Sequence, residues 1–156
     1  MNRQDETAIR PDRQPEWSWW PSPVVLFILI LTCAIELTLQ AADMGAVGTT
    51  RWRSLAYQYG AFWSGLLDNW RPNYTAQPWA MFITYQGLHT GLSHLLGNML
   101  VLVLVARILI ARVGPAWFTA IYVISGIGGG LGYALLSDNA QPMVGASGAL
   151  FGLVGA

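Results

Sequence analysis

The sequence contains no lysine, only one cysteine and few charged residues of either sign. Eight arginines balance eight acidic residues, so the net charge is zero at pH 7. Such a chain has no basic surface for recruiting nucleic acid. The single cysteine, Cys33, lies in an apolar run; it can form no internal disulfide and therefore says nothing about the redox compartment.

What the sequence has instead is apolar surface. The chain is 54% hydrophobic and 10% charged. Seven of the charged residues fall within residues 1–16, and from residue 86 onward only Arg107, Arg112 and Asp138 are ionic. These values indicate a chain that lies in lipid. We therefore predict an all-α, polytopic transmembrane helical bundle.

The N-terminal part is predicted to be a tail followed by a membrane helix. Residues 1–22 mix arginines, carboxylates and prolines and cannot bury a core, so we expect a mobile cytoplasmic tail. Tryptophans at 17, 19 and 20 are typical of the headgroup layer. The run 24–42 is long enough to cross a bilayer. A signal peptide is the alternative, but the tail has no positive bias and residues 39–41 are a poor cleavage site, which favours an uncleaved anchor.

Glu36 lies inside this first run, where an ionised carboxylate is costly. It is expected to face other helices, water or the interface, with a structural role. Residues 43–88 follow as a long loop broken by glycine and proline and rich in aromatic residues. No span fits this segment, so we predict short helical pieces in the membrane interface.

Three further apolar segments are predicted at 91–111, 115–136 and 145–156, with a turn at Gly114-Pro115. Arg107 and Arg112 near that turn place it in the cytoplasm by the positive-inside rule. The loop 43–88 and residues 137–144 then face outside. The last segment is too short to cross a bilayer, so we expect three full spans and the start of a fourth. Either the chain is a fragment, or its last helix needs a partner.

His94 and Asn98 are polar groups inside the second predicted span. They are four residues apart and so share one helical face. Hydrogen bonding to a neighbouring helix is the usual role of such residues in membranes. The alternative is that both direct donors at one point, as an oxyanion hole requires.

Gly145-Ala146-Ser147-Gly148 opens the last segment. Small residues of this kind often serve helix packing. A serine at a helix N-terminus is, however, surrounded by backbone N–H groups that can bind an anion. The hydrolase signature G-x-S-x-G is excluded because position 149 is alanine. Five glycines between 126 and 132 do not fit a dinucleotide loop either, and predict that another helix crosses there.

Together these motifs resemble the rhomboid family of intramembrane serine proteases. The resemblance is carried by His89, His94 and Asn98 in HTGLSHLLGN, followed about fifty residues later by Gly145 and Ser147. It implies a rhomboid-like membrane domain over 23–156. It also implies Ser147 as nucleophile, an oxyanion hole of His94, Asn98 and the Ser147 amide, and Gly145 as a backbone position that admits substrate. His89 would support the loop.

Two departures from the family pattern lead to further expectations. The Trp-Arg pair that the family carries before the second helix is Trp79-Ala80-Met81 here, so the arginine of this pair is missing and the family's usual loop anchor is not provided at this position. The family's general base is a histidine on the sixth helix, and no such residue is present. We therefore expect this chain alone to be inactive, because a serine needs a base.

The leading hypothesis from the sequence is a rhomboid-type serine endopeptidase that cleaves transmembrane substrates near the outer face of the membrane. The expected membrane is a bacterial inner membrane, with the N-terminus in the cytoplasm. No metal or cofactor is expected. The competing hypothesis is a non-catalytic rhomboid-like protein that binds transmembrane segments. The bilayer is the expected surrounding in both, and the sequence predicts no nucleic-acid partner and no particular oligomeric state.

Overall fold

The structure is a computed structural model that describes residues 22–137 and 140–156. Its elements are, in order, α1 (Pro23–Asp43), α2 (Trp52–Gly60), η1 (Ser64–Leu67), α3 (Gln77–Thr84), η2 (Tyr85–Gly87), α4 (Leu92–Leu136) and α5 (Ser147–Gly155). Within the described ranges no strand is present, which confirms the all-α prediction there. The predicted tail and its three tryptophans lie outside the described residues, except for residue 22.

α1 contains the whole predicted run 24–42. It begins at Pro23, a residue suited to the first turn because it has no N–H to leave unsatisfied. The buried face consists of Val25, Thr32, Glu36, Leu39 and Ala42. Their spacing follows one side of a helix. The opposite side exposes large apolar residues such as Phe27 and Ile30, as expected of a helix that faces lipid.

The loop after α1 is folded into short helices around an aromatic core. Phe62, Met81 and Tyr85 are fully buried, and the Phe62 ring packs edge-on against Phe82 with centroids 4.9 Å apart. Several aromatic side chains remain exposed, among them Trp79 and Trp70. This arrangement agrees with the prediction of short helical pieces carrying aromatic residues.

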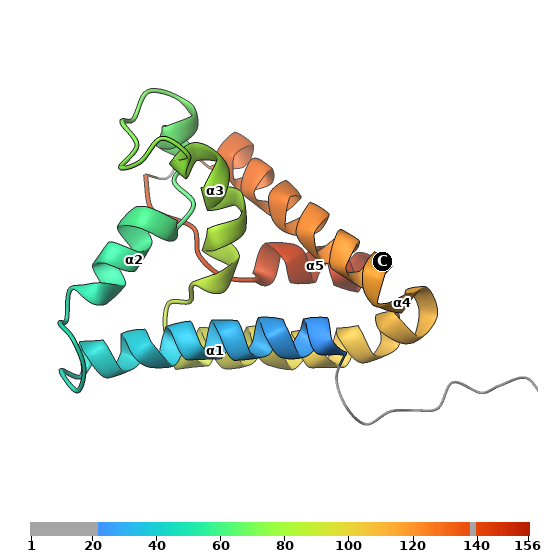
Figure 1. Cartoon of the computed structure of the whole chain (residues 1–156). Helices are drawn as coiled ribbons and strands as arrows, with labels where there is room; N and C mark the ends of the chain where they lie inside the picture. The colour runs from blue at the N-terminus through green and yellow to red at the C-terminus, as the bar shows by residue number, and fades with distance from the viewer. Residues whose placement is uncertain (1–21, 138–139) are drawn as a thin grey trace, which may run out of the picture.

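α4 is a helical hairpin. Gly114 has φ 81° and ψ 167°, which is not helical, and Pro115 follows it. Figure 1 shows the chain doubling back at this point. The predicted turn is therefore confirmed. By length and composition α1 and α4 are the two candidate membrane spans among the described residues, and the break divides α4 into arms of about 33 Å, each close to the thickness of a bilayer core.

α5 lies between the two arms of α4, in the middle of the molecule (Figure 1). The contact with the second arm is very close: a methyl group on Gly129 would lie 2.9 Å from the Cα atom of Gly148. Leu95, Leu102 and Leu150 belong to the same buried cluster. The prediction that a helix crosses the glycine-rich part of this arm is confirmed, and the crossing helix is α5.

Two backbone hydrogen bonds fix the approach to α5. The Phe62 N–H donates to the Met143 carbonyl at 3.0 Å, and the Met143 N–H donates to the Phe62 carbonyl at 2.9 Å. The loop 43–88 and the segment before α5 are thus joined directly. This connection places the start of α5 beside the start of α4.

Candidate active site

The candidate site lies where the first turn of α4 meets the segment that enters α5. His94 is half-buried and Asn98 is 7% exposed, one turn further along the same face. A methyl group placed on Gly145 would lie 2.7 Å from Cε1 and 2.9 Å from Nε2 of His94, and 3.6 Å from Nδ2 of Asn98. Both side chains therefore face the backbone at Gly145. Ser147 follows two residues later; its catalytic role, like those of the other three residues, stays a prediction.

Gly145 has a backbone conformation that requires glycine. Its φ of +120° lies in a region that residues with a side chain rarely adopt. Its N–H donates to the Tyr85 carbonyl at 2.9 Å, which ties the segment to the interfacial loop. Since any side chain would also collide with the His94 ring, the close approach of these groups depends on glycine.

The orientation of the His94 ring is set by Thr90. The backbone N–H of Thr90 donates to Nδ1 of His94 at 3.5 Å, and the Thr90 hydroxyl lies 3.2 Å from the same atom. A ring nitrogen that accepts from an N–H carries no proton, so in the neutral imidazole the proton is on Nε2. Nε2 and Cε1 are the two ring atoms nearest to Gly145. The arrangement thus directs an N–H donor toward the backbone that leads to Ser147.

Asn98 uses one amide hydrogen within its own helix. Nδ2 donates to the His94 carbonyl at 3.1 Å. The amide has a second N–H, and Nδ2 is the Asn98 atom nearest to Gly145. This hydrogen bond lies within α4 and does not reach a neighbouring helix, and the donor role of Asn98 stays a prediction.

Ser147 is the first residue of α5, after the N-cap Ala146, and is half-buried. The Leu150 N–H donates to the Ala146 carbonyl at 3.0 Å, as the first turn of the helix requires. The N–H groups of residues 147–149 precede this bond and have no partner within the helix. Such N–H groups, together with the helix dipole, favour negative charge at the serine.

His89 is fully buried beneath the site. Its ring is edge-on to that of His94, with centroids 5.2 Å apart, and within the described residues neither ring nitrogen has a hydrogen-bond partner. Burial, and to a smaller extent the neighbouring His94, lower the pKa of His89 to about 4. The imidazole is therefore neutral at physiological pH.

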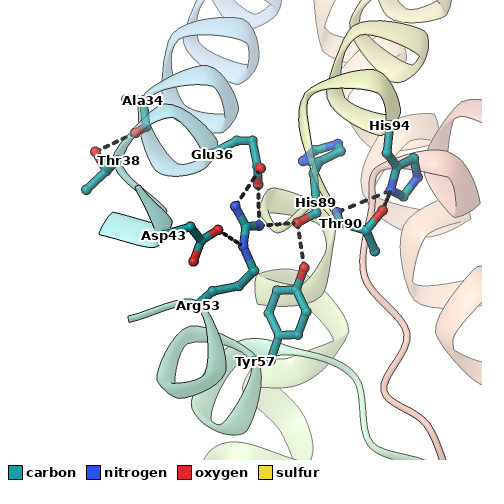
Figure 2. A network of polar contacts seen from close by, with 9 residues as sticks. All are labelled: Ala34, Glu36, Thr38, Asp43, Arg53, Tyr57, His89, Thr90 and His94. Atoms are coloured by element: carbon teal, nitrogen blue, oxygen red, sulfur yellow. Dashed lines mark hydrogen bonds and ion pairs between the residues drawn. The ribbon is translucent and has the colours of Figure 1, made fainter. Parts of the chain in front are cut away.

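Sequence reasoning missed Arg53 of α2. Its guanidinium contacts Glu36, Asp43 and the backbone carbonyl of His89, as Figure 2 shows. The arginine of the family's Trp-Arg pair is missing, and a different arginine, from the first helix of the loop, links the loop to α1. The signal was Glu36, because a carboxylate in an apolar helix needs a cation nearby.

Comparison with known protein families gives a match over much of the chain. The family model described as "Rhomboid domain" matches residues 75–156. The putative rhomboid protease YdcA of Bacillus subtilis (strain 168) is 34% identical over 133 residues, which are 85% of this chain and 60% of that protein.

Plant proteins are also similar. RHOMBOID-like protein 1 of Arabidopsis thaliana is 41% identical over 92 residues, covering 59% of this chain and 23% of the relative. Inactive RHOMBOID-like protein 8 of the same plant is 34% identical over 106 residues, covering 66% of this chain and 27% of that protein. The chain thus spans only part of the length of each of these relatives.

Proposed function

Because the chain belongs to the rhomboid family, we propose that it forms the nucleophile and oxyanion-binding part of an intramembrane serine endopeptidase that cleaves transmembrane substrates. One observation carries the proposal. His94 and Asn98 converge on Gly145, two residues before a serine at a helix N-terminus. Two polar side chains that only stabilised helix packing would have no reason to meet beside that serine.

In this proposal Ser147 Oγ attacks the scissile carbonyl carbon and the carbonyl oxygen becomes negatively charged. His94 Nε2–H, the second N–H of Asn98 and the backbone N–H of Ser147 donate hydrogen bonds to that oxygen. Donors fixed in place before the reaction stabilise the transition state more than the substrate, and each contributes about 3 kcal/mol or more. The missing side chain at Gly145 lets the His94 ring lie against this backbone, since a Cβ there would be 2.7 Å from the ring.

The base that accepts the Ser147 proton has to come from elsewhere. His89 and His94 are the only histidines among the 156 residues. His94 is assigned to the oxyanion, and His89 is buried with a pKa of about 4. We propose that the base lies outside these residues, so that the 156-residue chain alone does not hydrolyse peptides.

The apolar helices and the family indicate an integral membrane protein. We propose that the turn at Gly114 is cytoplasmic, because Arg107 and Arg112 lie shortly before it, and that the N-terminus is cytoplasmic as well. The candidate site lies at the other end of the helical bundle, near the outer face. A bacterial inner membrane fits this orientation.

The test is cleavage by the protein at the full length that its gene encodes, reconstituted in liposomes with a fluorogenic transmembrane substrate. We expect cleavage by the wild type and none by Ser147→Ala. His94→Ala and Asn98→Ala should each lower kcat by about 10²-fold, with little change in KM, because an oxyanion donor acts in the transition state.

Ser93→Ala is the matched control, since Ser93 is an exposed serine on the first turn of α4 and should leave the rate unchanged. Unimpaired cleavage by a folded Ser147→Ala protein would contradict the proposal. Equal losses of activity in the Ser93 and Ser147 variants would contradict it too, because they would point to general damage to the fold.

A second candidate function is binding of transmembrane segments without catalysis. It is favoured by the similarity to a relative described as inactive. Under this alternative, Ser147→Ala retains full function, and a transmembrane peptide still co-purifies with the variant.

A further inference from the structure

Arg53 connects three groups that are far apart in the sequence. Nη1 and Nη2 donate to the two carboxylate oxygens of Glu36 at 3.0 and 2.9 Å, and Nε donates to Asp43 at 2.6 Å. Nη1 also donates to the backbone carbonyl of His89 at 3.0 Å. Figure 2 shows the guanidinium between the α1 carboxylates on one side and the His89 carbonyl on the other.

The α1 side of this network is rigid. Glu36 is fully buried, and the planar fork of arginine matches its two oxygens. The hydrogen bond to Glu36 raises the pKa of Arg53, so the guanidinium is always charged. An ion pair of this kind holds both side chains in one geometry, because either charge would be costly to bury alone.

The third contact leads toward the candidate site. The Tyr57 hydroxyl donates to the same His89 carbonyl at 2.6 Å, so two donors one turn apart on α2 hold a single backbone oxygen. The next residue along the chain is Thr90, whose N–H and hydroxyl approach Nδ1 of His94. A continuous path therefore runs from Glu36 through Arg53 and the 89–90 peptide to the His94 ring.

We propose that Arg53 and Tyr57 are positioning residues: by fixing the His89 carbonyl they hold Thr90 against His94 and so select the ring tautomer with the proton on Nε2. Neither side chain touches the reacting atoms. The consequence for catalysis rests on the function proposed above, but the effect on the His94 ring does not.

Histidine ring resonances measure this effect directly. The full-length protein is labelled with [15N]histidine, carries a histidine-free affinity tag and is studied in detergent micelles. His94→Gln identifies the ring pattern of His94, because that pattern disappears in the variant. In the wild type we expect His94 to have the Nε2–H tautomer. Tyr57→Phe and Arg53→Met should both move His94 toward a mixture of tautomers.

Asp43→Ala is the matched control. It removes the contact to Nε of the same guanidinium without touching the His89 carbonyl, so the His94 pattern should not change. If Arg53→Met does not fold, Tyr57→Phe still tests the proposal, because it removes one hydroxyl and no charge. Folded Tyr57→Phe protein with the wild-type His94 tautomer would overturn the proposal and leave the network a structural anchor only.

Kinetics of the full-length protein provide the second readout. Tyr57→Phe should lower kcat between about tenfold and hundredfold with KM unchanged, as for a displaced catalytic donor. A shifted His94 tautomer in a protein without any proteolytic activity would support the positioning role and refute the proposed protease function. A loss of kcat with an unchanged tautomer would refute the positioning role alone.

Discussion

Individual residues show why His89 should make the stability of this protein depend on pH. Its ring is fully buried and its pKa is lowered from 6.5 to about 4, with burial as the main cause. Between these two values the unfolded chain binds a proton at His89 that the folded chain does not bind. Folding stability therefore falls as the pH falls through this window, by up to about 1.4 kcal/mol per pH unit.

Unfolding in detergent micelles, followed by tryptophan fluorescence at pH 7.5, 6 and 5, measures this dependence. His89→Phe keeps an aromatic ring against His94 but cannot titrate, so its stability should change less over the same range. All other titrating groups are present in both proteins, and their contributions cancel in the comparison. Equal pH slopes for the two proteins would show that His89 is not a buried neutral imidazole.

The sequence predicted part of the site residue by residue. The four-residue spacing of His94 and Asn98 was enough to place them on one helical face. Their meeting with Gly145 depends on tertiary packing about fifty residues away, for which the motif resemblance was the only guide. Arg53 was not predicted, because its partners lie 17 residues before it and 36 after it, and no local pattern selects it from the other arginines of the loop.

At the scale of helices, the packing of α5 on α4 depends on which glycine faces it. A methyl group on Gly129 would meet the backbone of Gly148 at 2.9 Å, whereas a methyl group on the adjacent Gly128 has nothing within 4 Å. Gly129→Ala should therefore lower the free energy of unfolding by about 1–3 kcal/mol. Gly128→Ala should leave it unchanged or raise it by up to about 1 kcal/mol, because alanine favours helix.

Unfolding of the two variants under identical conditions is the measurement, and each variant is the control for the other. A similar change in both would mean that α5 does not approach this face of α4. The prediction concerns the difference in free energy of unfolding between the two variants, and not the absolute value for either one.

The bounds of the long helices could be predicted from the sequence, whereas for the short helices only their presence was predicted. Continuous apolar runs locate α1 and both arms of α4 to within a few residues, and Gly114-Pro115 marks the break. α2 and α3 have only nine and eight residues in a loop broken by glycine and proline, so their ends were not predicted. Their positions follow from packing around Phe62 and from hydrogen bonds that span the loop.

In the described part of the molecule, three polar features gather at one end of the helical bundle. The Arg53 network, the His94 turn and the entry to α5 lie together, and the bridge between Phe62 and Met143 joins the two loops that carry them. The Gly114 turn, in the middle of α4, is at the opposite end of the bundle (Figure 1). One end of the bundle therefore has a network of hydrogen bonds and ion pairs. The exposed apolar side chains between the two ends are compatible with contact to lipid.

The central claim is that Ser147 is a nucleophile served by His94 and Asn98. Covalent modification by a fluorophosphonate, mapped by tandem mass spectrometry on the full-length protein in membranes, tests it most directly. We predict an adduct on Ser147 that forms about 10²-fold more slowly when either His94 or Asn98 is replaced by alanine. An adduct confined to another serine, or a rate at Ser147 that is unchanged when both donors are removed, would contradict the account.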